Sequence, residues 1–163
     1  MIATIRLQRE DFDAAVEAAK ITRGRTDVGA VVTFAGICRD SDGVAAMTLE
    51  HYPGMAEAEI ARHVADAERR WSLQGITIIH RYGRLVPGDN IVLVVTAAAH
   101  RGDAFAAAEF LMDYLKTSAP LWKKEERGSE ARWVDAKHAD DVAAARWSQS
   151  PGKTSPRKRE AAE

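Results

Sequence analysis

The chain has 163 residues, 46% of them hydrophobic, which is the length and composition of one ordinary globular domain. Its 23 basic and 24 acidic residues give a formal net charge of -1, so no overall field attracts nucleic acid or an anionic membrane. Neither a leader sequence nor a membrane span is recognisable, and a single cysteine, Cys38, excludes an internal disulfide and any multi-cysteine metal site. We therefore expect a soluble cytoplasmic protein.

The first third of the chain predicts strands and a helix in turn. Residues 2–7 alternate weakly between apolar and polar and predict a strand, and the alanine-rich residues 11–20 predict a helix. Residues 30–36 (AVVTFAG) are β-branched and aromatic, which predicts a buried strand. Residues 39–43 are polar turn residues, and residues 44–52 resume a strand-like pattern.

A helix is expected directly after the Pro53-Gly54 stop. Apolar residues recur there at steps of three to five, close to one helical face, and we expect them in the core. They are Met55, Ile60, Val64, Ala67 and Trp71.

The second half of the chain predicts a hairpin and a long helix. Residues 75–82 and 90–98 are rich in β-formers and flank the turn signal Pro-Gly-Asp at 87–89, so we expect them to pair. A helix follows from about Asp103 and ends before Pro120. Its apolar stripe consists of Phe105, Ala108, Leu111, Met112 and Leu115.

Short elements and a polar tail complete the predicted organisation. Residues 132–134 predict a short strand and residues 140–147 a short amphipathic helix. The fold class that follows is α+β, a two-layer sandwich of a largely antiparallel sheet with helices on one face, plus a small additional β element. We expect one domain over residues 1–147 and a disordered polar and basic tail over residues 148–163, which lacks a hydrophobic anchor.

Common cofactor and metal signatures are missing from the sequence. It contains no G-x-G-x-x-G, no phosphate loop ending in Gly-Lys-Ser/Thr and no G-x-S-x-G elbow. The five histidines are scattered, without an H-x-x-x-H pair, and Cys38 has no thiol neighbour. We therefore expect a mechanism that uses no metal.

Several cations instead stand at the ends of predicted elements. They are Arg39, His100, Arg101, Lys116 and Lys123. Such side chains can converge on one pocket, bind an anion and stabilise charge that develops in a transition state. The alternative interpretation is structural: Lys116 complements the helix C-terminal dipole, and Lys123 is a surface charge balanced by nearby glutamates.

Three segments carry a family resemblance. They are LEHYPGM at 49–55, HRYG at 80–83 followed by PGD at 87–89, and HR at 100–101 followed by DYLK at 113–116 and APLWKKE at 119–125. In this order and spacing they resemble the molybdopterin synthase large-subunit family, from about Gly29 to about Trp147. The resemblance implies a sulfurtransferase that converts a cyclic pyranopterin monophosphate to molybdopterin.

The resemblance also implies the partners. A small ubiquitin-like sulfur-carrier subunit inserts its C-terminal Gly-Gly tail, which bears a thiocarboxylate, into the large subunit, and the large subunit forms a homodimer. No metal, nucleotide or organic cofactor is implied. Because both ligands are anionic, a pocket of fixed cations is also what electrostatics requires.

Site residues follow by resemblance, as hypotheses. Lys116 and Lys123 are the catalytic lysines, because a lysine, unlike an arginine, can exchange its proton or become a nucleophile. The substrate-binding candidates are Arg39, His100 and Arg101 for the phosphate and pterin, Arg132 as a weaker candidate for the same pocket, either within the chain or across a dimer interface, and Phe34, which packs either against a ligand or in the core.

Three other interpretations stay open on sequence grounds. Cys38 stands where the family leads us to expect an aliphatic residue, and a thiolate beside Arg39 could carry a persulfide, although small buried cysteines usually behave as hydrophobes. The chain could be a non-catalytic binding module for an anionic metabolite or a ubiquitin-like tail. Nucleic-acid binding through the basic tail is disfavoured, because the tail contains no aromatic residue.

Overall fold

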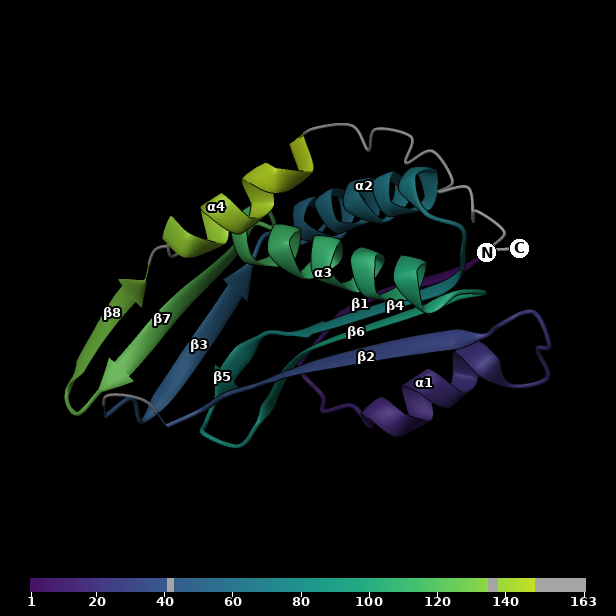
Figure 1. Ribbon diagram of the computed structural model, residues 1–163. Coiled ribbons are helices and arrows are strands. Elements are labelled where there is room, and N and C mark those ends of the chain that lie inside the picture. The colour runs from purple at the N-terminus through teal and green to yellow at the C-terminus, as the bar shows by residue number, and fades with distance from the viewer. Residues whose placement is uncertain (41–42, 135–137, 149–163) are drawn as a thin grey trace, which may run out of the picture.

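The computed structural model describes residues 1–40, 43–134 and 138–148. The elements, in chain order, are β1 (Ile2–Gln8), α1 (Ala14–Thr22), β2 (Ala30–Ile37), β3 (Ala46–His51), α2 (Met55–Arg70), β4 (Leu73–Arg81), β5 (Gly83–Leu85), β6 (Asn90–Ala98), α3 (Arg101–Thr117), β7 (Leu121–Arg127), β8 (Glu130–Val134), α4 (His138–Ala145) and the 3-10 turn η1 (Arg146–Ser148). Within the described residues they form two sheets with the strand orders β1-β4-β6-β2 and β5-β3-β7-β8 (Figure 1). The predicted α+β class and the additional β element are confirmed.

The first sheet is buried on both faces at its centre. β4 and β6 pair antiparallel, as predicted for a hairpin across the Pro-Gly-Asp turn, and β1 pairs with β4 in parallel. Because successive side chains of a strand point to opposite faces, Ile78 and Val94 lie under α2 and α3, whereas Ile79 and Leu93 lie against α1. Figure 1 shows α1 on one side of this sheet and α2 and α3 on the other. Helices therefore cover both faces.

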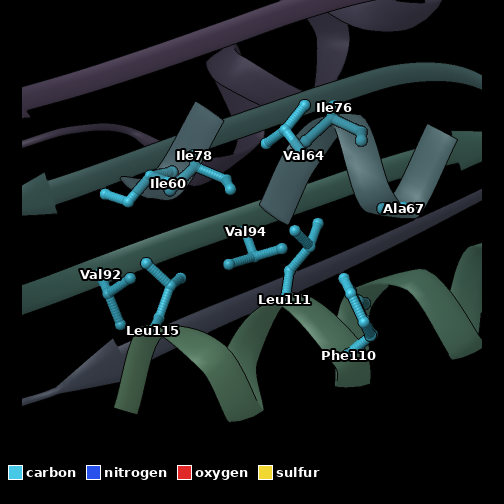
Figure 2. Close-up of a cluster of buried hydrophobic side chains, with 11 residues drawn as sticks. Ile60, Val64, Ala67, Ile76, Ile78, Val92, Val94, Phe110, Leu111 and Leu115 are labelled. Carbon is cyan, nitrogen blue, oxygen red and sulfur yellow. The ribbon is translucent and has the colours of Figure 1, made fainter. Parts of the chain in front are cut away.

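The main hydrophobic core lies between the first sheet and the helices α2 and α3 (Figure 2). The predicted helical stripes supply Ile60 and Val64 from α2 and Leu111 and Leu115 from α3. Phe110 is fully buried among them. Each large side chain buried in this way contributes roughly 1.5–3 kcal/mol to folding.

Three expected core positions are exposed instead. The strand predicted as buried at 30–36 is β2, which pairs only with β6 among the described residues. As the edge strand of its sheet, it leaves Phe34 40% and Ile37 55% exposed. Met55 and Phe105, expected in apolar stripes, are also largely exposed. Both stand near the start of a helix, α2 or α3, where the neighbouring Ala56 and Ala104 are buried in their place.

The second sheet is entirely antiparallel. β3 pairs with β5 on one side and β7 on the other, and β8 pairs with the far edge of β7. One face packs a small core of Cys38, Met47, Leu49 and Leu85. The charged segment after Pro120 thus forms a regular strand, in which alternate residues point to the two faces of the sheet.

The C-terminal elements α4 and η1 form a strap across α3. Trp147 packs edge-on against Phe110 and Trp71, and its indole nitrogen donates a 2.7 Å hydrogen bond to Asp113. The predicted helix at 140–147 is therefore present, with α4 beginning at His138. The predicted tail, residues 148–163, lies outside the described residues except for Ser148, so the division at residue 147 stays a prediction. None of the described helices is long and apolar enough to cross a membrane.

Candidate functional site

Lys123 stands on β7, one of the two inner strands of the second sheet, beside an acidic residue. Its Nζ lies 2.6 Å from Oε1 of Glu125, and Nη2 of Arg127 lies 3.0 Å from the other carboxylate oxygen. These two hydrogen bonds outweigh the effect of burial and hold the pKa of Glu125 below its usual range. Glu125 was expected only as a surface charge, because the sequence KKEER does not show which side chains share a face of the strand.

Arg132 belongs to the same face as Lys123. In the register of β7 and β8, Arg132 stands directly opposite Glu125. Directly opposite residues of an antiparallel pair project to the same side of the sheet. The predicted grouping of Arg132 with Lys123 is therefore compatible with one chain and needs no second copy.

The loop that carries Arg39 is fixed next to this cluster. The backbone N–H of Cys38 donates to the carbonyl of Asp89 at 2.8 Å. The carbonyl of Cys38 accepts from the backbone N–H of Gly88 at 2.7 Å. Cys38 also packs beneath the second sheet, near enough for the Lys123 charge to act on its thiol. Arg39, the next residue, is exposed at this end of β2.

The structure argues against a persulfide on Cys38. Its side chain is only 2% exposed, and burial, reinforced by the charge of Asp89, raises the pKa of the thiol despite the opposite effect of Lys123. A reactive cysteine needs the reverse, an accessible thiol with a lowered pKa. Cys38 is best understood as a small core residue.

Lys116 stands at the C-terminal end of α3, one residue before the helix ends. Its side chain is 54% exposed, and its Nζ lies 3.6 Å from Oδ1 of Asp140 in α4. Three residues, 118–120, connect this end of α3 to β7. Lys116 and Lys123 thus flank one short connection, each with a different acidic neighbour.

His100 and Arg101 lie at the opposite end of α3. His100 is the N-cap residue and makes no side-chain capping hydrogen bond, Arg101 begins the helix, and both are exposed. Lys116 comes fifteen positions after Arg101, which at 1.5 Å per residue along the helix is roughly 22 Å. One chain therefore does not bring all the predicted cations into one pocket.

Phe34 lies between these two groups of cations. It stands in the middle of β2, opposite Val94 of β6, and is exposed rather than part of the core. β2 begins opposite Ala98, close to His100, and ends at Ile37, just before Cys38 and Arg39. The edge strand β2 thus connects the His100–Arg101 end of the molecule to the Arg39–Lys123 end.

The candidate site residues in the described part of the chain are mainly cationic. No group of three histidine, cysteine, aspartate or glutamate side chains there is arranged to hold a metal ion. The arginines can bind oxyanions through paired N–H donors, and the lysines can in addition exchange protons.

Comparisons with known proteins agree on one family. Residues 7–118 match the family model described as MoaE protein. The molybdopterin synthase catalytic subunit of Mesorhizobium japonicum is 63% identical over 150 residues, which cover 90% of this chain and 94% of that protein. The solved structure of a molybdopterin biosynthesis MoaE protein from Burkholderia ambifaria is 52% identical, covers 91% of this chain and 99% of its own, and superposes with a TM-score of 0.78.

A more distant structure shares the fold. It is a chain from the protein–protein complex of subunits 1 and 2 of the molybdopterin-converting factor of Helicobacter pylori. It is 18% identical and has a TM-score of 0.69, with 84% of this chain and 92% of that chain covered. From the family model and the high identity over most of its length, the chain belongs to the MoaE protein family.

Proposed function

We propose that the chain is a cytoplasmic molybdopterin synthase catalytic subunit. It transfers sulfur from the C-terminal thiocarboxylate of a small ubiquitin-like carrier to a cyclic pyranopterin monophosphate, without a cofactor of its own. The observation that carries the proposal is the 63% identity with a molybdopterin synthase catalytic subunit over 90% of the chain. The Helicobacter pylori chain of the same fold occurs in a complex of two different subunits, which supports a separate carrier.

The charges of the second sheet support a reaction between two anions. Lys123, Arg127 and Arg132 lie on one face of this sheet, where these three cations outnumber the two carboxylates of Glu125 and Glu130. A thiocarboxylate and a phosphate repel each other, and fixed cations offset this repulsion before bonds change. Lys123 contacts the thiocarboxylate in this scheme and polarises its carbonyl, and Lys116 assists proton transfer or forms a transient covalent link.

A homodimer completes the site. β2 exposes apolar side chains along an edge that no other described strand covers, and monomeric proteins generally protect such edges. A twofold axis near Phe34, in the middle of β2, would exchange the two ends of this strand between the copies. His100 and Arg101 of one copy would then lie beside Arg39 and Lys123 of the other and bind the pterin and phosphate there.

A single-turnover assay tests the enzyme against the binding module. Purified chain is mixed with thiocarboxylated carrier and the cyclic precursor, and molybdopterin is measured for wild type, Lys116→Ala and Lys123→Arg. An enzyme loses product formation in both variants while carrier binding persists, because arginine keeps the charge but cannot exchange the proton. A chain that binds carrier or precursor tightly yet forms no product is a binding module, and the proposal is then wrong.

Mixing two inactive variants tests the shared site. Lys123→Ala and Arg101→Ala chains are each expected to be inactive alone. If both residues act in one site across the dimer, a mixed dimer has one of its two sites intact. Random exchange of subunits makes about half of the dimers mixed, so about a quarter of wild-type activity should return. A mixture that stays inactive although subunit exchange is demonstrated would show that the two residues act within one chain.

A further inference from the structure

The C-terminal strap makes a polar contact with the proposed catalytic Lys116. Oδ1 of Asp140 in α4 lies 3.6 Å from Nζ of Lys116, and the side chain of Asp140 is only 25% exposed. We infer that Asp140 is a positioning residue, which holds the Lys116 ammonium in the orientation that sulfur transfer requires. This inference rests on the role proposed for Lys116 above.

The position of Asp140 is fixed by a dense set of contacts at the end of the strap. Arg146 places Nη2 2.7 Å from Asp113 and 2.8 Å from Glu109 of α3. Trp147 donates its indole N–H to the same Asp113 at 2.7 Å, and its carbonyl accepts from Arg70 of α2 at 2.9 Å. Four polar contacts and the partly buried indole therefore attach the strap to α2 and α3.

Asp113, which anchors the strap through Arg146 and Trp147, and Lys116 lie on the same side of α3. Residues three apart on a helix are neighbours on its surface, so Asp113 and Lys116 share one face. The strap is thus held at Asp113 and reaches Lys116 one turn further along, toward the C-terminal end of α3. Figure 1 shows α4 lying over this end of α3.

Lys116 needs such a partner more than Lys123 does. Its side chain is long, more than half exposed and attached to the last turn of a helix, where few neighbours restrict its rotamers. A carboxylate beside the ammonium limits these rotamers but leaves the ammonium able to bind a ligand. The contact exceeds hydrogen-bonding distance, so an anionic ligand can readily replace the carboxylate.

The direct test replaces Asp140. In the single-turnover assay, Asp140→Asn should lower the maximal rate about two- to fivefold, the range expected for a partly exposed ion pair, at an unchanged half-saturating precursor concentration. Asp140→Glu should restore most of the rate because it keeps the charge. Asp141→Asn, one residue further on the same helix and exposed, is the matched control and should equal wild type.

Two further measurements separate positioning from loss of folding. Asp113→Ala releases the anchor without touching Lys116, so it should slow the reaction, and adding Asp140→Asn to it should slow the reaction no further. Acetylation of Lys116 should become faster in Asp140→Asn. Mass spectrometry would monitor the reaction, with acetylation of Lys124 as the internal reference.

The outcomes are distinct from those that test the function itself. An Asp140→Asn rate equal to or above wild type, with Lys116→Ala inactive, overturns the positioning role and leaves the proposed function intact. A wild-type rate in Lys116→Ala, or no product from wild type, removes the proposed role of Lys116, and the inference falls with it.

Discussion

Neutralising Glu125 should destabilise the protein by a predictable amount. Its carboxylate is 15% exposed and binds two cations whose side chains are 38% exposed, for Lys123, and 46% exposed, for Arg127. A buried charge-assisted hydrogen bond contributes about 1.5–3 kcal/mol, but hydration of these half-exposed cations reduces each pair to roughly 0.5–1 kcal/mol. Glu125→Gln should therefore cost about 1–2 kcal/mol, equivalent to roughly 2–8 °C in Tm.

The pH dependence of this loss gives the sharper test. Because the two hydrogen bonds lower the pKa of folded Glu125, its stabilisation is complete above the ordinary glutamate pKa of about 4.3 and is lost as the pH falls through the lower folded value. Urea unfolding of wild type and Glu125→Gln should differ at pH 7 and converge in acid. A difference that is absent at pH 7, or that does not shrink below about pH 4, would refute the argument.

Three other perturbations follow from the fold and the proposed dimer. Phe110→Ala should cost about 3–5 kcal/mol in urea unfolding, because the fully buried ring packs against Trp71 and Trp147; a loss below about 1 kcal/mol would contradict that packing. Burial lowers the pKa of His63, so stability should decline as the pH falls below about 6.5, the unfolded value, and less so in His63→Gln; equal slopes would show that His63 does not titrate this way. Phe34→Asp should give monomers in sedimentation experiments and abolish activity; an active dimer would place the interface elsewhere.

Periodicity and turn chemistry predicted the centre of the fold. The β4–β6 hairpin follows from two β-rich segments around Pro-Gly-Asp, and the core face of α2 follows from Ile60, Val64 and Ala67. The exposure of β2 could not be predicted in this way. An apolar edge strand and a buried strand have the same sequence pattern, and only the order of the described strands shows that β2 has one neighbour among them.

Site residues were predictable as residue types but not as an arrangement. Glu125 is hidden in a charged run until the pairing of β7 with β3 and β8 puts it on the face of Lys123 and Arg132. The separation of Arg101 from Lys116, by contrast, follows from the length of the predicted helix. That length alone argues against one pocket within one chain.

The two proposed catalytic lysines are held in physically different ways. Lys123 is in the middle of a sheet, with β3 and β8 on either side and Glu125 at 2.6 Å, so local structure alone fixes its place. Lys116 is at the end of a helix, where backbone hydrogen bonding ceases and the side chain reaches toward solvent. Precise placement of both lysines on one thiocarboxylate therefore requires an added restraint on Lys116 alone, and the strap that carries Asp140 is the element of the described chain that supplies one.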